Sequence, residues 1–132
     1  MLQFTQDVVG LTEATEPYLD TLLGFDPVTW LCQEGNLALT DGDGNWALFE
    51  KSEDGIYTGH YFFVVRGRAA KKLALQMLSF FFEKTGVKTL RGLTPLANLG
   101  ARWMSRQIGF KGHGVIQTVN GPCELFILTK EV

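Results

Sequence analysis

Four basic side chains fall within seven residues near the middle of the chain, with small residues between them. The segment reads Arg66-Gly67-Arg68-Ala69-Ala70-Lys71-Lys72, and it follows a predicted strand and opens a predicted helix. Small residues at such a turn let backbone N–H groups approach a ligand closely, and a helix N-terminus adds unpaired donors and partial positive charge. Because bases oppose the dipole at that end of a helix, a bound anion such as a phosphate explains them. The alternative is a solvated basic turn.

Two further side chains are candidates for acid–base chemistry. His60 falls in the middle of a predicted strand, titrates near neutrality, and shares a strand face with Thr58 and Phe62. Glu50, near the end of the neighbouring strand, could act through a water molecule. The alternative for His60 is a hydrogen-bonded histidine of the core, and for Glu50 it is a solvated strand end. We therefore expect His60 to be the better candidate for a general base.

Several familiar motifs are incomplete or missing. Asp41, Asp43 and Asn45 have the spacing of the first ligands of a calcium loop, but Trp46 replaces the required glycine and Ser52 the bidentate glutamate. We therefore expect a simple turn there. The chain has no GxxxxGKS/T or GxSxG segment, and its histidines and cysteines lack metal-ligand spacing, so no metal site is predicted. The aromatic side chains occupy predicted core positions, which argues against a nucleic-acid surface.

The length and composition of the chain are typical of one globular domain. It has 132 residues and 45% hydrophobic side chains. We expect a single domain over 1–132, with a helical N-terminal part in 1–35 and the sheet, the basic anion-binding segment and a C-terminal hairpin in 36–132. No apolar run reaches the ~18 residues of a membrane span, and no signal peptide is evident, so a cytoplasmic protein is predicted. Cys32 and Cys123 are then expected to be free thiols, with a disulfide as the weaker alternative.

Charge is distributed unevenly along the chain. Residues 1–59 hold eleven acidic residues and one basic residue, a net charge of −10. Residues 60–132 hold eleven basic and three acidic residues, a net charge of +8, so the whole chain carries −2. This split predicts that the second half contacts an anion and that the first half attracts a cation. The alternative is that the two halves attract each other across the fold.

The apolar pattern predicts helices first and strands after them. Two short helices are expected in residues 8–35, the second with Asp26 as N-cap and Pro27 at its first position. Strands are expected over 36–40, 46–51 and 56–65. The third of these is apolar on both faces near its end, which is typical of a central strand.

The second half of the chain alternates helices with strands. A well-buried helix is expected over 73–84, ended by Gly86. A strand follows over 87–93, and Thr94-Pro95 resembles the N-cap and first-turn proline of a helix that runs to about Ile108. Strands over 115–119 and 124–129, joined by Asn120-Gly121-Pro122, form a hairpin. This order of elements predicts an α+β fold with a mixed sheet.

Together these pieces resemble the GCN5-related N-acetyltransferase (GNAT) superfamily over residues 36–129. The resemblance rests on the strand that ends at Arg66-Gly67-Arg68-Ala69-Ala70, on the helix at Asn98–Ala101, and on Gly109-Phe110 before the hairpin. It implies a GNAT-like, mostly antiparallel sheet flanked by helices, with a strand-turn-helix site for acetyl-coenzyme A (acetyl-CoA). The implied cofactor contacts are Phe62, Phe63 and Val64 for the pantetheine arm, Arg66, Gly67, Arg68, Ala69, Ala70 and Lys71 for the pyrophosphate, Asn98 for the arm, and Arg102 or Lys111 for the 3′-phosphate.

The chain departs from the family pattern at several positions. Ala69 replaces the central glycine of the pyrophosphate turn, and Lys71 replaces its last small residue. In the family a tyrosine commonly protonates the leaving thiolate, and Ser105 occupies the matching position. The resemblance therefore adds Ser105 to His60 and Glu50 as a third candidate catalytic residue. The first strand of the family is expected to be short or missing here.

The resemblance implies acetyl transfer from acetyl-CoA to a primary amine of a small molecule or a protein. The acidic first half, with Asp41, Asp43 and Glu53, predicts a cleft for a cationic acceptor. One alternative is a catalytically silent GNAT-like binding or assembly protein, which Ser105 favours. Another is a small nucleic-acid binder that uses the basic half. The chain resembles the compact GNAT-like proteins of tailed-phage genomes, and we expect a monomer or a homodimer.

Overall fold

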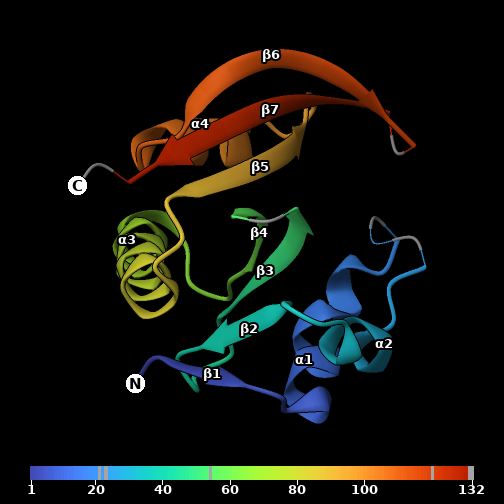
Figure 1. The fold of residues 1–132 in the computed structure, drawn as a ribbon. Helices are drawn as coiled ribbons and strands as arrows, with labels where there is room; N and C mark the ends of the chain where they lie inside the picture. Colours follow the sequence, from blue (N-terminus) through green and yellow to red (C-terminus); the bar gives the residue numbers. More distant parts are fainter. Residues whose placement is uncertain (21, 23, 54, 120, 131–132) are drawn as a thin grey trace.

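The computed structural model describes residues 1–20, 22, 24–53, 55–119 and 121–130. Strands of these residues form one sheet in the order β1-β2-β3-β4-β5-β7-β6 (Figure 1). Their bounds are β1 Gln3–Thr5, β2 Leu37–Thr40, β3 Trp46–Glu53, β4 Ile56–Phe62, β5 Thr89–Pro95, β6 Lys111–Thr118 and β7 Gly121–Thr129. Neighbouring strands are antiparallel except β4 and β5, which run parallel. The predicted α+β fold with a mixed, mostly antiparallel sheet is confirmed, and β4 is its central strand.

The N-terminal segment contributes two helices and one short strand. Helix α1 (Val8–Thr15) is capped by Asp7, and α2 (Pro27–Cys32) begins with Asp26 as N-cap and Pro27 in its first turn, as predicted. A 3-10 turn, η1 (Glu16–Tyr18), follows α1. β1 is the short first strand, and it pairs with β2 at the edge of the sheet. The segment 1–35 is therefore not helical throughout.

Several predicted boundaries in the rest of the chain are wrong. β4 ends at Phe62 instead of residue 65, and α3 spans Gly67–Thr85, so the basic segment is the first turn of the helix. β5 extends through Thr94 and Pro95, which pair with β7, and α4 (Leu99–Gln107) is capped by Asn98. β6 and β7 begin four and three residues earlier than expected. Of the predicted hairpin turn, Asn120 lies outside the described residues.

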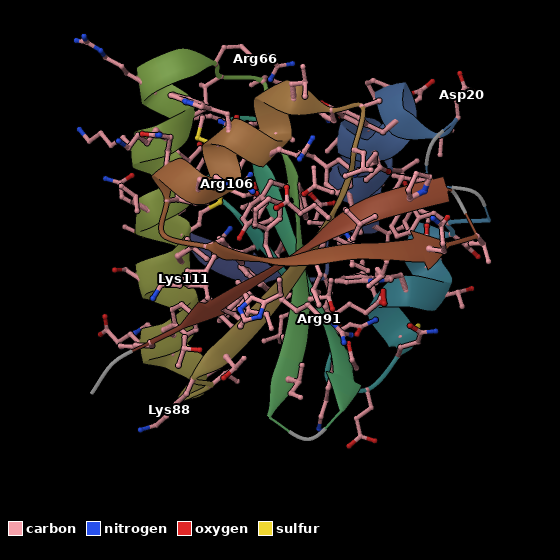
Figure 2. The ribbon with its side chains drawn as sticks, turned by 90° about the horizontal axis from the view of Figure 1, so that it is seen from above. Asp20, Arg66, Lys88, Arg91, Arg106 and Lys111 are labelled. Atoms are coloured by element: carbon pink, nitrogen blue, oxygen red, sulfur yellow. The ribbon has the colours of Figure 1, made fainter. Side chains whose placement is uncertain are left out.

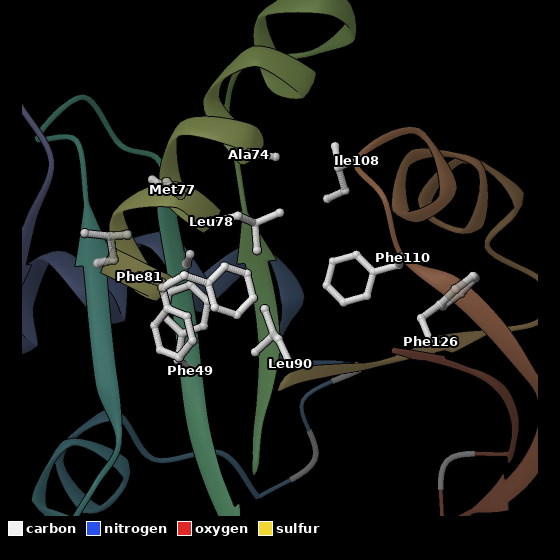
Figure 3. Packing of buried hydrophobic residues seen from close by; sticks show 12 residues of the cluster. Phe49, Ala74, Met77, Leu78, Phe81, Leu90, Ile108, Phe110 and Phe126 are labelled. Carbon is white, nitrogen blue, oxygen red and sulfur yellow. The ribbon is translucent and has the colours of Figure 1, made fainter. Parts of the chain in front are cut away.

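Two separate apolar clusters pack on the two faces of the sheet. In Figure 1, α3 lies on one face and α1 and α2 lie on the other. The α3 cluster contains apolar side chains of the predicted buried helix, such as Met77 and Leu78, and includes Phe49 stacked on Phe81, with ring centroids 4.0 Å apart (Figure 3). The opposite cluster comprises Leu11, Trp30, Leu31, Ala38, Trp46, Leu48 and Phe62. Because successive residues of β3 and β4 enter opposite clusters, the register of this strand pair fixes which side chains face which helices.

Within the described residues, no helix is long and apolar enough to cross a membrane. Cys32 is an exposed free thiol and Cys123 a buried one, so the two cysteines are unlinked as expected. Glycine is required by backbone geometry at Gly86, which ends α3 with φ +70° and donates its N–H to Phe82.

Candidate active site: a cleft between two diverging strands

β4 and β5 pair only over their first residues and then separate. Their pairing runs from Ile56 opposite Thr89 to Thr58 opposite Arg91. Beyond this point β4 remains paired with β3, and β5 remains paired with β7. The two strands therefore turn unpaired backbone edges toward each other. They line a cleft of about 870 Å³ with residues 59–63 of β4 and the loop after it, and with residues 92–95 of β5.

The walls of this cleft come from four parts of the fold. α3 contributes Ala70 and Ala74, and α4 contributes Ala101, Met104 and Ser105. The remaining lining residues are Asp20 and Leu22 before α2, Asn98 at the start of α4, Ile108 and Phe110 after it, and Thr118, Val119 and Cys123 of the β6–β7 hairpin. Most of this lining is apolar, and a few polar groups converge on it. This combination is typical of a small-molecule site.

The N-terminus of α3 has no capping side chain. Arg66 occupies the N-cap position without a side-chain cap bond, and the first turn contains no acidic residue. Gly67 has φ +61°, a conformation that favours glycine, and a Cβ there would meet no atom within 4 Å. The first backbone N–H groups of the helix therefore lack both helical partners and a side-chain cap. Figure 2 shows Arg66 at this end of α3.

The loop between β4 and α3 is held by a side chain that sequence reasoning did not identify. Asn45 is buried, and its Oδ1 accepts hydrogen bonds from the backbone N–H of Val64 (2.9 Å) and Val65 (3.2 Å). Its Nδ2 donates to Asp41 Oδ2 at 2.9 Å. These bonds take the N–H groups that a longer β4 would use, and they explain why the strand ends at Phe62. The Asp41–Asn45 segment is the predicted turn, and its function is to position this loop.

Arg66 belongs to the same loop and folds back on it. Its Nη1 donates to the carbonyls of Phe63 and Val65. Among the other predicted cofactor contacts, Phe63 lines the cleft while Val64 is exposed beside Gly44. Arg68 and Ala69 are exposed on the first turn of α3, and Lys71 is half-buried there.

His60 lies in the cleft, whereas Glu50 lies beside it. Leu48 is opposite His60 and Glu50 is opposite Thr58, so His60 and Glu50 are diagonal neighbours on the α1–α2 face of the sheet. Burial lowers the pKa of His60 below its ordinary value of 6.5, and the nearby Glu50 carboxylate partly offsets this. Glu50 accepts a hydrogen bond from Trp30 Nε1 at 3.3 Å. His60 is therefore a neutral imidazole at pH 7 that can accept a proton.

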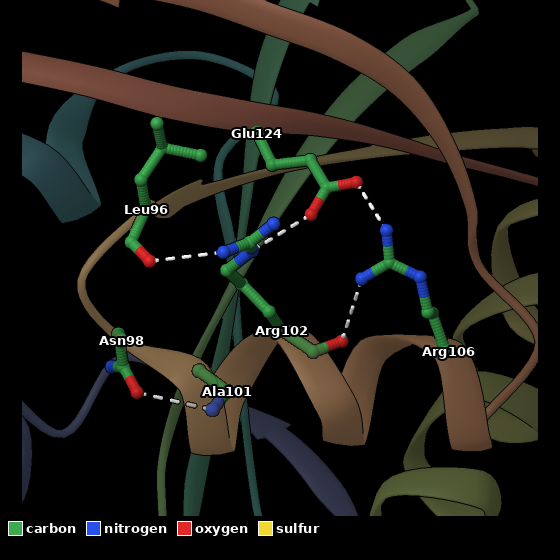
Figure 4. A network of polar contacts seen from close by, with 6 residues as sticks. All are labelled: Leu96, Asn98, Ala101, Arg102, Arg106 and Glu124. Atoms are coloured by element: carbon green, nitrogen blue, oxygen red, sulfur yellow. Dashed lines mark hydrogen bonds and ion pairs between the residues drawn. The ribbon is translucent and has the colours of Figure 1, made fainter.

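Asn98 and Arg102 form structural contacts on α4. Asn98 Oδ1 accepts from the N–H of Ala101 at 3.0 Å, which caps the helix. Arg102 donates to Glu124 Oε1 at 2.9 Å and to the carbonyl of Leu96 at 3.0 Å (Figure 4). Glu124 also pairs with Arg106, and both arginines lower the pKa of its carboxyl, Arg106 most strongly. A 3′-phosphate would therefore have to compete with Glu124 for the guanidinium of Arg102.

The cleft brings together some of the predicted site residues and leaves others outside it. His60, Phe62, Phe63, Ala70, Asn98 and Ser105 line it. The predicted site residues that do not line it are Glu50, Val64, Arg66, Gly67, Arg68, Ala69, Lys71, Arg102 and Lys111, together with the acidic turn residues Asp41 and Asp43. The cleft also contains Tyr61, Cys123 and Asp20, which no sequence pattern marked because each becomes part of the site only through the fold.

Comparison with known proteins supports the fold but gives no sequence-level match. No protein-family model and no curated protein matches the chain. Among solved structures, the chain resembles the aminoglycoside acetyltransferase AAC(6′)-Ib in complex with coenzyme A and kanamycin, with a TM-score of 0.72 and 17% identity over 98% of this chain and 94% of that one. It also resembles a spermidine N-acetyltransferase, SpeG, from Vibrio cholerae, with a TM-score of 0.77 and 9% identity over 98% and 94%.

A third similar solved structure is that of a GNAT superfamily enzyme. The GNAT superfamily phosphinothricin acetyltransferase Pat from Sinorhizobium meliloti, in complex with acetyl-CoA, matches with a TM-score of 0.72 and 13% identity over 98% of this chain and 87% of that one. The protein therefore has the GNAT fold.

Proposed function

We propose that the protein binds acetyl-CoA in the β4–β5 cleft and transfers its acetyl group to a primary amine. The observation that supports this most directly is the position of the α3 N-terminus. Its uncapped N–H groups and basic side chains follow immediately after the strand that lines the cleft. One end of the site thus suits a phosphate group, and the rest suits an uncharged arm.

The residues present fit this cofactor. The N–H groups of the first turn of α3, from Gly67, would bind the pyrophosphate, with charge from Arg68 and Lys71. The open edge of β4 and the side chains of Phe62 and Phe63 would hold the pantetheine arm, and Asn98 lies across the cleft from them. Val64 N–H is already bonded to Asn45, so a carbonyl-polarising N–H would come from Phe62 or Phe63. When bound, acetyl-CoA supplies an activated thioester.

Proton transfer from the acceptor amine is assigned to His60. It lies in the cleft, and its lowered pKa keeps the imidazole neutral and able to accept a proton. Glu50 is close enough to affect the charge of His60, and it would stabilise the imidazolium that forms. Asp20 at the cleft gives a cationic acceptor a carboxylate partner, whereas Asp41 is occupied by turn hydrogen bonds. AAC(6′)-Ib and SpeG act on amines, and this supports an amine acceptor here.

The proposal is tested first by thermal unfolding with acetyl-CoA, ATP and NAD at equal concentrations. A ligand at about a hundred times its Kd stabilises by ~2.7 kcal/mol and should raise Tm by several degrees. We expect this rise with acetyl-CoA only. Release of free thiol with a panel of primary amines then measures turnover. His60→Gln should keep the Tm rise and lose roughly a hundredfold in kcat/KM. If acetyl-CoA does not raise Tm, the proposed cofactor is wrong.

A second function is favoured by Ser105, which provides no phenol at the position where the family commonly has one. A catalytically silent GNAT-like binding or assembly protein would bind acetyl-CoA, or a partner in the same cleft, without releasing thiol. A Tm rise without turnover on any amine would support this function. The likeness to compact phage-type members remains a prediction.

A further inference from the structure

One buried polar atom in the cleft region has no hydrogen-bond partner. Among the described side chains, the hydroxyl of Tyr61 is the one buried side-chain polar group left unsatisfied. Its ring packs against Phe49 and Phe63, on the α3 face of β4. A buried hydroxyl without a partner costs free energy, so its retention needs an explanation. A ligand that supplies a hydrogen-bond acceptor is such an explanation.

The chain leaves space for this hydroxyl beside Gly59, which lines the cleft. A Cβ on Gly59 would lie 3.2 Å from Tyr61 Oη and 3.5 Å from Leu90 Cδ2. Gly59 has no left-handed backbone geometry that would require glycine, so its small size is what matters. It follows directly after Thr58, the last residue of β4 that pairs with β5. The hydroxyl therefore lies where the two strands begin to separate.

We propose that Tyr61 Oη donates a hydrogen bond to the sulfur atom of bound acetyl-CoA and stabilises the thiolate that leaves. This rests on the proposed function, because it requires acetyl-CoA in the cleft. If the N-terminus of α3 held the phosphates and β4 the arm, Gly59 and Tyr61, which lie further back along β4, would be the residues near the thioester. The role missing at Ser105 is then supplied from β4 instead of α4.

The chemistry balances without an additional reactant. The amine nitrogen forms a bond to the acetyl carbon, the C–S bond breaks with its electron pair on sulfur, and His60 accepts the amine proton. Burial raises the pKa of Tyr61 far above its ordinary value, so the phenol keeps its proton and acts as a donor. The thiolate is held by this hydrogen bond until His60 or solvent protonates it. Preorganised donors of this kind act where charge develops.

The test compares coenzyme A with desulfo-coenzyme A, which lacks the sulfur atom. In the wild type we expect coenzyme A to bind about tenfold more tightly than the desulfo form, and in Tyr61→Phe the two Kd values should be equal. Tyr57→Phe is the matched control, because Tyr57 lies on the same strand and face but outside the cleft lining. It should keep the wild-type ratio. An unchanged ratio in Tyr61→Phe, or a ratio lost in Ser105→Ala instead, overturns the proposal.

Stability without ligand separates this role from a structural one. Tyr61→Phe removes an unsatisfied hydroxyl and no hydrogen bond, so its Tm should equal or exceed that of the wild type while kcat falls at least tenfold. A fall in Tm with unchanged kcat would show that the hydroxyl serves packing only. Failure of the proposed function looks different, because the wild type itself would then bind neither form of coenzyme A.

Discussion

Two groups of basic side chains lie on the two helices that line the cleft, and they differ in how their charge is balanced. On α4, Arg102 and Arg106 share the buried carboxylate of Glu124. On the first turn of α3, Arg68 and Lys71 have no ion pair within the described part of the chain, and no acidic residue accompanies them. The first group is balanced by a carboxylate of the fold itself, whereas no acidic side chain of the described residues pairs with the second.

The balanced group is built into the packing around it. Arg106 lies over the ring of Phe126, 5.0 Å from its centroid, and Glu124 is held between the two arginines. A Cβ on Gly112 would lie 2.5 Å from Glu124 Oε2, so glycine there makes room for the carboxylate. The α3 group has no such surroundings. The comparison therefore indicates that basic charge on α4 stabilises the fold, while basic charge on α3 is available for binding.

The largest expected effect comes from removing the unbalanced charge. Arg68→Gln together with Lys71→Gln should raise the Kd of acetyl-CoA by roughly tenfold or more, because charge-assisted bonds to phosphate are lost. Tm without ligand should not fall, since bases at a helix N-terminus oppose its dipole. Lys84→Gln with Lys88→Gln is the matched control, because it removes equal charge at the opposite end of α3. Isothermal titration calorimetry on both double variants measures the difference, and equal Kd values would contradict the comparison.

The next effect concerns the balanced group. Glu124→Gln leaves two guanidinium groups facing each other without a carboxylate, and Tm should fall by about 5 °C or more. If this network does not bind a phosphate, the Kd of acetyl-CoA should stay within about twofold of the wild type. Glu83→Gln on the exposed side of α3 is the same chemical change and should leave Tm nearly unchanged. If Glu124→Gln instead strengthened cofactor binding, Arg102 would regain its predicted 3′-phosphate role.

The sequence was sufficient for features that depend on local pattern. The Asp26–Pro27 helix start, the apolar stripe of α3 and its end at Gly86 follow from residues within a few positions of one another. The same local rules failed at Thr94-Pro95, which has both signals of a helix start. There, pairing of β5 with β7 outweighs the capping preference, and Asn98 caps α4 four residues later. Both Thr94 and Asn98 can cap a helix, and the tertiary pairing of β5 with β7 decides that α4 begins after Asn98.

The site itself depends on contacts that are distant in sequence. Strand alternation does not reveal where two parallel strands separate, so the cleft beyond Thr58 and Arg91 was not predictable. The bond from Asn45 to Val64 spans 19 residues, and the pair of Arg102 with Glu124 spans 22. The basic segment and His60 could be predicted as candidates because their residue types and sequence neighbours alone suggest the chemistry. Tyr61 was not, since a single tyrosine in an aromatic strand has no pattern that distinguishes it from core.

The smallest expected effect is a dependence of stability on pH that belongs to the α4 group. The arginines hold the pKa of Glu124 below its ordinary value of 4.5, so the folded protein binds fewer protons there than the unfolded chain. Stabilisation by this carboxylate is complete above pH 4.5 and is lost as pH falls toward the lowered pKa. Urea midpoints of the wild type and Glu124→Gln should therefore differ most near pH 6 and converge once the pH falls below the lowered pKa of Glu124.

Convergence at low pH would make the two groups alike, because protonated Glu124 leaves the arginines of α4 as unbalanced as the bases of α3. An added anion such as sulfate should then stabilise the wild type with protonated Glu124 as strongly as it stabilises Glu124→Gln near pH 6. A constant difference between the two proteins across this range would mean that the carboxylate contributes through its shape and hydrogen bonds alone. In that case the arginines of α4 would differ from the bases of α3 because of how they pack, and not because their charge is balanced.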